Sequence, residues 1–227
     1  MFGKKKICIL DTNSLLFSFK LDVRPERAID KIIRQFNLAI PEKILEEYKS
    51  KTKKGLLKGY DNIKQDIDLF FKRMKSEGRV FETKNYFHCL EYTERWFNLM
   101  GKQQEYKNKI DEGEKHCIAL GLFLSRKNEK CLYIVTDDFD AVDAGIRLFV
   151  ERQKIGLVFA LPELMTMNYL IDKGVPELNI KSFISDYFSL NKMRSDKFSN
   201  LKTELFEEIN YSCKKQFYHN CNICCRF

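Results

Sequence analysis

The sequence has few of the residues that interrupt regular structure, and it has no long apolar segment. Its 227 residues include 10 Gly and 4 Pro, which argues against collagen-like and low-complexity chains. No run of about 18 apolar residues is present, so we expect no membrane span. The first 13 residues are basic, but their apolar run ICIL is too short for a signal peptide and ends at Asp11. We therefore expect a cytoplasmic protein.

The composition predicts a packed core and a moderate preference for polyanions. Hydrophobic residues make up 44% of the chain and charged residues 32%, with a formal net charge of +8, so general disorder is excluded. Much of the positive charge lies between residues 49 and 79. On its own, such a run is best explained as a solvated helix face. The functional hypothesis is that it contacts nucleic-acid phosphates, chiefly through Lys51, Lys53, Lys54 and Lys58.

The chain contains 8 Cys, which we expect to be reduced thiols because no signal peptide is apparent. Four follow the apolar patterns of core residues: Cys8, Cys89, Cys117 and Cys131. The other four crowd the tail, at Cys213, Cys221, Cys224 and Cys225. Together with His219 they have spacings that permit a structural Zn²⁺, but they match no standard zinc finger. We therefore favour an oxidisable tail without metal.

Short apolar runs alternate with helical patterns along the first 160 residues. The runs cover 7–10, 37–40, 131–135 and 156–160, with a weaker one at 79–83. Each is continuous, as is typical of strands buried on both faces of a parallel sheet. Helices are expected between them, two of which would open at Pro25 and Pro41. This alternation predicts an α/β fold, a three-layer αβα sandwich with a central parallel sheet and right-handed crossovers.

Three regions are expected along the chain. Residues 1–160 would form the α/β domain, and residues 161–195 a helical extension whose two helices open at Pro162 and Pro176. Residues 196–227 would hold a terminal helix and the Cys-rich tail. The aromatic helix at 86–100 is expected to serve as core or as a homodimer interface, with a base-stacking clamp as the less favoured alternative.

Carboxylates stand at several points that the fold would bring together. Asp11 follows the strand 7–10, and Asp137 and Asp138 follow the strand 131–135. A single acid at a strand end is most often a helix cap. However, two strand ends with acids, joined by helix-borne Glu47 and Glu114, would meet at one edge of a parallel sheet. Such a cluster needs a cation, and carboxylate oxygens favour Mg²⁺ or Mn²⁺ over Zn²⁺.

The ordered set DTNSLL, IPEKILEEY, DEGEKHCIALG and YIVTDDFDA resembles the PIN-domain nucleases, which include VapC-type toxins and RNA-maturation endonucleases. The resemblance covers about residues 6–160. It implies a PIN-like fold that cleaves RNA, usually single-stranded, with Mg²⁺ or Mn²⁺ and leaves 3′-hydroxyl and 5′-phosphate ends. A toxin would also have an antitoxin partner.

The resemblance also assigns roles to residues of this chain. Catalysis and metal binding would fall to Asp11, Glu47, Glu114 and Asp138, with Asp137 as a further ligand. Supporting polar groups would be Asn13, Ser14, Thr136, Asp111 and Glu46, the last being a less suitable choice than Glu47. One or two metal ions are compatible with this set.

Other α/β proteins with an acid after the first strand fit less well. A haloacid-dehalogenase-like phosphatase needs a second Asp two residues after Asp11, where this chain has Asn13. A response-regulator receiver domain needs paired acids there and a Lys after a late strand. A flap-endonuclease relative usually has more residues for its DNA-binding helices. The strongest alternative is a non-catalytic PIN-like module that binds RNA or a partner. Carboxylates without a cation are electrostatically costly, which counts against it.

Overall fold

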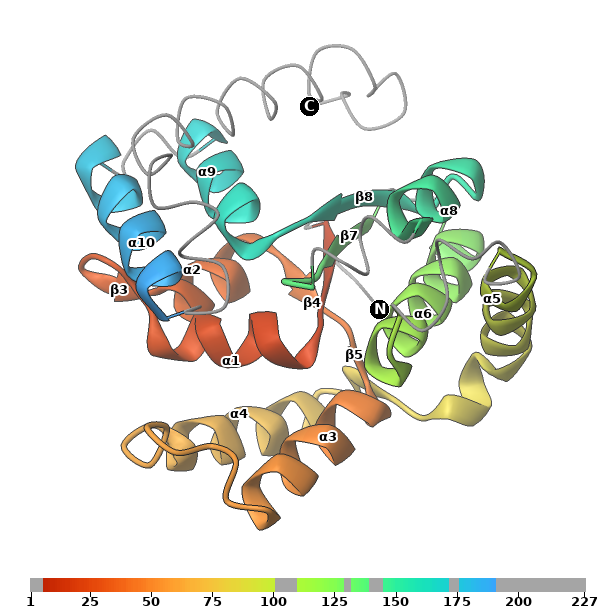
Figure 1. The fold of residues 1–227 in the computed structure, drawn as a ribbon, viewed down its shortest axis with the longest axis horizontal. Helices are drawn as coiled ribbons and strands as arrows, with labels where there is room; N and C mark the ends of the chain where they lie inside the picture. The colour runs from red at the N-terminus through yellow and green to blue at the C-terminus, as the bar shows by residue number, and fades with distance from the viewer. Residues whose placement is uncertain (1–5, 101–109, 129–131, 139–144, 172–175, 191–227) are drawn as a thin grey trace.

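The computed structural model describes residues 6–100, 110–128, 132–138, 145–171 and 176–190. Its centre is a four-stranded parallel sheet with the order β4-β1-β7-β8. These strands are β1 (Ile7–Leu10), β4 (Asn37–Leu38), β7 (Leu132–Val135) and β8 (Gly156–Phe159). Helices flank the sheet (Figure 1). The predicted α/β class with a central parallel sheet is confirmed, and the arrangement is compatible with a three-layer sandwich.

The two inner strands are buried along their whole length. Every residue of β1 and β7 is buried, which explains why their sequences are continuously apolar rather than alternating. Their register pairs Ile7 with Leu132 and Leu10 with Val135, so both strands end at the same level. The residues that follow them, Asp11 and Thr136, therefore begin side by side at one edge of the sheet.

The helices are α1 (Thr12–Lys20), α2 (Ala28–Gln35), α3 (Glu42–Lys53), α4 (Lys64–Ser76), α5 (Phe87–Met100), α6 (Glu112–Asn128), α8 (Arg147–Arg152), α9 (Leu161–Ile171) and α10 (Glu177–Leu190). A 3₁₀ turn, η1 (Thr83–Asn85), precedes α5. Among the described residues, no helix is long and apolar enough to cross a membrane.

Three expectations about local structure need correction. The run 37–40 is not one strand: β4 ends at Leu38, and β5 (Ile40–Pro41) pairs instead with β6 (Val80–Phe81) in a separate two-stranded parallel sheet. Ile40 donates its N–H to the carbonyl of Arg79, 2.9 Å away, which turns the chain off the main sheet. This turn carries α3 away from the central sheet.

Pro25 does not open a helix. It lies between β2 (Asp22–Val23) and β3 (Glu26–Arg27), an antiparallel pair, and follows a cis peptide bond. Helix α1, which follows Asp11 directly, was not among the helices expected from apolar stripes. Pro41, in contrast, stands just before α3, as the sequence predicted.

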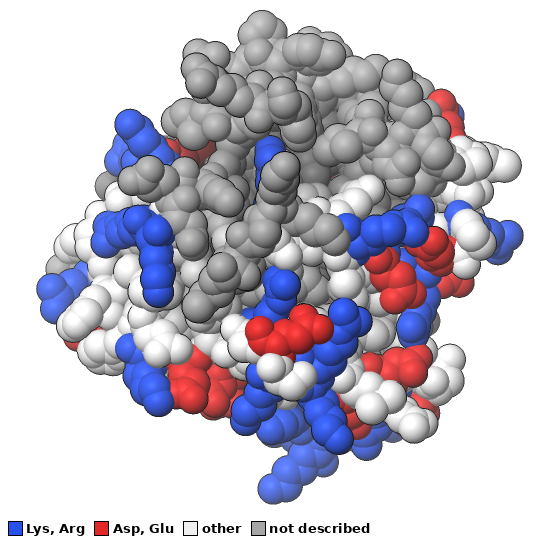
Figure 2. Space-filling model, turned by 180° about the vertical axis from the view of Figure 1, so that it is seen from behind, with Lys and Arg blue, Asp and Glu red and all other residues white. Residues whose placement is uncertain are grey.

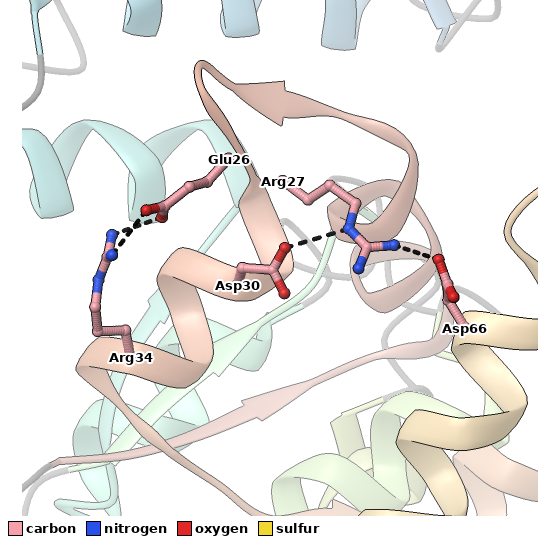
Figure 3. A network of polar contacts seen from close by, with 5 residues as sticks. All are labelled: Glu26, Arg27, Asp30, Arg34 and Asp66. Carbon is pink, nitrogen blue, oxygen red and sulfur yellow. Dashed lines mark hydrogen bonds and ion pairs between the residues drawn. The ribbon is translucent and has the colours of Figure 1, made fainter.

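Ion pairs connect the β2–β3 hairpin to two helices (Figure 3). Arg27 lies 3.2 Å from Asp30 of α2 and 2.6 Å from Asp66 of α4, while Arg34 makes two hydrogen bonds to Glu26. Exposed pairs of this kind contribute only about 0–1 kcal/mol each. Through Asp30 and Asp66, Arg27 connects α2 to α4.

The two C-terminal helices pack against the rest of the chain. The side-chain amide nitrogen of Asn179 in α10 donates a hydrogen bond to the backbone carbonyl of Arg24, 2.7 Å away. Tyr187 of α10 meets Phe17 of α1 edge to face, with ring centroids 5.5 Å apart. Residues 191–227 lie outside the described residues, so the expected terminal helix and the expected oxidisable tail without metal stay predictions. Cys8, Cys89 and Cys117 are buried free thiols, as expected, and Cys131 lies outside the described residues.

Candidate functional site

Asp11 and Asp137 form the centre of an acidic sheet edge. Asp11 is the N-cap of α1, and its Oδ1 accepts a hydrogen bond of 2.6 Å from the N–H of Ser14. Its Oδ2 accepts one of 3.3 Å from the N–H of Asp137. Asp11 is only 4% exposed and Asp137 only 6%. The cap explanation for Asp11 is therefore correct, and it holds the carboxylate against the end of β7.

The Asp137 carboxylate is held from the other side by the C-terminal extension. Its Oδ1 accepts hydrogen bonds from the N–H of Leu161, at 2.9 Å, and from the hydroxyl of Tyr187, at 2.8 Å. Its Oδ2 is buried and has no hydrogen-bond partner among the described residues. Tyr187 was missed by the sequence analysis. Its only signal was a place on the apolar stripe of α10, which says nothing of the hydroxyl.

Glu114 enters the edge from the first turn of α6. Its N–H donates to Oδ1 of Asp111 at 2.9 Å, and its Oε2 accepts from the N–H of Asp111 at 3.1 Å. This reciprocal pair is a capping box. The hydroxyl of Thr136 donates to Oε1 of Glu114 at 3.3 Å and accepts from the N–H of Asp138 at 3.2 Å. Thr136 thus connects Glu114 to Asp138, which is half-buried.

Glu47 reaches the same edge from α3. Its Oε2 accepts a hydrogen bond of 2.5 Å from the hydroxyl of Thr12. A β-carbon placed on Gly113 would lie 2.8 Å from both Glu47 carboxylate oxygens, so the carboxylate occupies the space that glycine leaves open at the start of α6. Neither Thr12 nor Gly113 was a candidate from the sequence. Glu46 is exposed, and its charge acts on Tyr86 and His116 instead.

Of the remaining candidates, Ser14 is buried beneath this edge and Asn13 is exposed beside it. Ser14 is fully buried, and its hydroxyl oxygen has no hydrogen-bond partner among the described residues. It lies close enough to both Asp11 and Asp137 to offset part of the rise that burial causes in the pKa of each carboxyl. Asn13 is exposed, and its Oδ1 accepts a hydrogen bond of 2.9 Å from Nζ of Lys51.

Burial and mutual repulsion make the carboxylates hard to ionise together. Burial first, and then the charges of Asp111, Asp11 and Asp138, raise the pKa of Glu114 to about 9. Burial and the charge of Asp11 raise the pKa of Asp137 to about 7. Burial also raises the pKa of Asp11 and that of Glu47. The edge therefore favours whatever supplies positive charge, either protons or a cation.

The residues fit a hard divalent cation by chemistry and are not arranged as a closed metal site. Within the described ranges, no three His, Cys, Asp or Glu side chains form a group that could hold one ion. The donors are carboxylate oxygens, as Mg²⁺ and Mn²⁺ prefer. The buried, unpartnered oxygens of Asp137 and Ser14 are polar atoms that a cation or its water would satisfy.

The candidate lysines extend from this edge along α3. Lys51 is half-buried beside Asn13, whereas Lys53, Lys54 and Lys58 are exposed at the end of α3 and in the loop that follows. Figure 2 shows Lys and Arg gathered along the lower edge of the molecule, where α3 and α4 lie in Figure 1. Of the four lysines of this basic surface (Lys51, Lys53, Lys54 and Lys58), Lys51 is the one that contacts the acidic edge, through its hydrogen bond to Asn13.

Comparisons with protein-family models, with curated proteins and with solved structures found no match to this chain.

Proposed function

We propose that this chain is a metal-dependent endoribonuclease with a PIN-type fold, which hydrolyses phosphodiester bonds of single-stranded RNA. One observation carries the proposal. Carboxylates from four separate segments come to the same edge of a parallel sheet, where hydrogen bonds connect Asp11 to Asp137, Thr12 to Glu47 and Thr136 to Glu114. In open α/β sheets this edge, at the carboxyl ends of the strands, is where ligands bind.

The residues that would hold Mg²⁺ or Mn²⁺ are Asp11, Glu47, Glu114 and Asp138, with Asp137 beside them. When bound, such an ion lowers the pKa of its water and offsets the charge of the leaving oxygen. The protein itself holds the carboxylates in place. The N–H of Ser14 fixes Asp11, and the hydroxyls of Thr12 and Thr136 fix Glu47 and Glu114.

Lys51 supplies the positive charge at the mouth of the site. It lies one helical turn after Glu47 on α3, and its ammonium group offsets part of the rise that burial causes in the pKa of that carboxyl. An ammonium group at this position is suited to contact an RNA phosphate next to the bond that is cut. Exposed Lys53, Lys54 and Lys58 would extend this contact along the strand.

The direct test is cleavage of labelled single-stranded RNA by the purified full chain. We expect products with Mn²⁺ or Mg²⁺ and none with EDTA. Asp11→Asn is the matched loss-of-function control for a contaminating nuclease, because it should remove the activity while leaving the purification unchanged. Equal cleavage by the parent and by Asp11→Asn would contradict the proposal.

One observation favours a second candidate, a PIN-like module that binds RNA without cutting it. The carboxylates of four site residues already accept hydrogen bonds within the protein: Asp11, Glu47, Glu114 and Asp137. The same experiment separates the two candidates. RNA that is bound by the parent chain but stays intact with Mn²⁺ and with Mg²⁺ would favour the binding module.

A further inference from the structure

A cavity of about 220 Å³ lies between α3, α4 and the loop that joins them. Its aromatic and apolar lining includes Tyr48, Leu57, Tyr60 and Ile67. Its polar lining consists of Thr52, Lys58, Asp61 and Lys64. This combination of aromatic rings with ammonium groups is that of sites that stack nucleic-acid bases and contact the adjoining phosphates.

The loop that forms one wall is internally bonded. Tyr60 donates its N–H to the carbonyl of Leu57 at 3.0 Å, and its own carbonyl accepts from the N–H of Ile63 at 3.0 Å. Gly55 and Gly59 have φ values of +65° and +85°, a conformation that favours glycine. The turn therefore fixes the position of Tyr60 before any ligand arrives.

The ring of Tyr60 is also held by a cation. Nζ of Lys20 lies 4.6 Å from the centroid of this ring, within the range of a cation–π contact. Lys20 is not among the residues that line the cavity, so its ammonium group supports the ring from outside. Burial raises the pKa of Tyr60 to about 12, which keeps the phenol neutral beside a ligand.

The cavity adjoins the acidic edge through α3. Glu47 faces Thr12 and Gly113 at that edge, while Tyr48, the next residue, lines the cavity. The same division repeats one turn later, where Lys51 bonds to Asn13 and Thr52 lines the cavity. Two neighbouring faces of one helix thus serve the two features, and a strand of RNA at the edge needs little length to reach the cavity.

We propose that this cavity is a base-binding subsite for single-stranded RNA, in which one base stacks against Tyr60 while Lys58 and Lys64 contact its flanking phosphates. The proposal rests on the proposed function for the identity of its ligand. It adds the place to which the RNA strand runs when it leaves the acidic edge. The volume admits a single base rather than a longer segment, because complete small-molecule sites usually enclose about 300–1,000 Å³.

The test measures binding of a short labelled single-stranded RNA in EDTA, by fluorescence anisotropy, so that cleavage plays no part. Tyr60→Leu should weaken binding about tenfold, the typical loss when one stacked base loses its aromatic partner. Tyr60→Phe keeps the ring and should bind as the parent does. Tyr92→Leu is the matched control, since Tyr92 is 40% exposed on α5 and also lies beneath a cation, Arg126.

A second oligonucleotide of equal length and charge, with abasic nucleotides throughout, separates stacking from phosphate contact. Tyr60→Leu and the parent should bind it equally. A third, with one fluorescent purine analogue, should lose emission on binding the parent chain. This readout stands even if Tyr60→Leu does not fold.

The proposal is overturned if Tyr60→Leu binds intact RNA as tightly as the parent, or if its affinity for the intact and the abasic oligonucleotides falls equally. Unquenched fluorescence on binding would also overturn it. Competition by a free nucleoside monophosphate as strong as that by RNA would show a mononucleotide site instead. Failure of the proposed nuclease function is a separate result, in which the parent shows these binding differences but does not cut RNA with Mn²⁺.

Discussion

Asp11 and Asp137, which follow neighbouring parallel strands, are joined by a hydrogen bond of 3.3 Å from the N–H of Asp137 to Oδ2 of Asp11. The other oxygen of Asp11 caps α1 through the N–H of Ser14. One carboxylate therefore connects β1, α1 and β7 at the centre of the acidic edge. A change at Asp11 tests catalysis and cap geometry at the same time, unless the substitute retains the cap.

Asp11→Asn is that substitute, because an amide oxygen still accepts the N–H of Ser14. An amide cannot offset the charge of a divalent cation, so cleavage should fall roughly a hundredfold or more. Asp138→Asn should act in the same way. In EDTA the melting temperature of Asp11→Asn should stay close to that of the parent, because the relief of repulsion within the cluster offsets the hydrogen bond from the N–H of Asp137 that the amide nitrogen cannot accept. The measurement pairs cleavage rates with thermal melting.

Asp22→Asn serves as the matched control, since Asp22 is an exposed residue of β2 and should leave cleavage unchanged. Parental activity in Asp138→Asn would remove that residue from the metal site. Parental activity in both site variants would contradict the nuclease proposal.

Two glycines of α6 allow position and stability to be separated. In Gly113→Ala the new methyl group would lie 2.8 Å from the oxygens of Glu47, so the carboxylate must move. A displacement of about 1 Å at a reacting site costs on the order of a hundredfold in rate. The melting temperature should change little, because the preference of a helix for alanine over glycine, up to about 1 kcal/mol, offsets the cost of moving Glu47.

Gly121→Ala is the contrasting variant. Its methyl group would lie 3.0 Å from Cδ1 of Ile134 and 3.2 Å from Cγ2 of Ile155, in the core rather than at the site. We expect a lower melting temperature and a preserved cleavage rate. The reverse pattern, in which Gly113→Ala cuts RNA normally, would show that Glu47 has no part in the reaction.

The acidic edge could be predicted from the sequence because its central residues follow strand ends. In the sequence, each of these strand ends is an apolar run that is followed by acidic residues. Asp11 and Asp137 follow β1 and β7 directly, and parallel pairing brings such positions together. Glu114 could be predicted for a similar reason, because it lies at the start of a helix at the same edge of the sheet. The spacing of Asp111 and Glu114 also matches a capping box, a structural role that the sequence analysis did not consider.

The groups that hold these carboxylates could not be predicted from the sequence in this way. Tyr187 contacts Asp137 from 50 residues further along the chain, and only the packing of α10 decides this contact. Gly113 owes its role to the approach of α3, which follows from the turn at Ile40 away from the main sheet. That turn was predicted to be part of a continuing strand because Leu38, Ala39 and Ile40 are apolar without interruption.

Tyr187→Phe tests whether the C-terminal extension belongs to the site. The variant removes one of the two donors to Oδ1 of Asp137 and leaves the other, the N–H of Leu161. Above about pH 7, where Asp137 is ionised, a buried hydrogen bond to its charged carboxylate contributes about 1.5–3 kcal/mol, so the free energy of unfolding should fall by a comparable amount. Urea denaturation measures this change.

Cleavage by Tyr187→Phe should also fall, because Asp137 loses part of its orientation. Tyr92→Phe is the control, since Tyr92 is 40% exposed. A variant that is destabilised but cuts RNA at the parental rate would limit Tyr187 to a structural role.

Removal of divalent cations should make stability depend on pH through Glu114. Its pKa is raised from 4.5 to about 9 in the folded chain, so the folded state holds a proton that the unfolded chain has released. The free energy of unfolding must then decrease as pH rises from about 4.5 to about 9. Each unit by which the pKa is raised corresponds to about 1.4 kcal/mol.

Glu114→Gln carries no titrating proton and should flatten this dependence. In EDTA at pH values above neutrality it should melt higher than the parent, by roughly 2–4 °C per kcal/mol relieved. Added Mn²⁺ should raise the melting temperature of the parent more than that of the variant. Glu163→Gln, a change at an ion pair with Arg147, controls for the removal of one negative charge. Equal pH profiles for Glu114→Gln and the parent would contradict the expected charge state.

The basic surface gives the last prediction, which concerns binding rather than catalysis. A variant in which alanine replaces four lysines should bind single-stranded RNA more weakly, whatever its sequence: Lys51, Lys53, Lys54 and Lys58. Its dependence on salt should also be flatter, by about one unit of slope for each phosphate that the variant no longer neutralises. Lys51 should account for more than a quarter of the loss, because its hydrogen bond to Asn13 places it next to the acidic edge.

A control variant removes the same charge elsewhere by replacing four other basic residues with alanine: Lys127, Arg152, Lys154 and Lys181. Anisotropy titrations at several salt concentrations compare the two variants, and equal weakening in both would mean that net charge alone, and not this surface, attracts RNA.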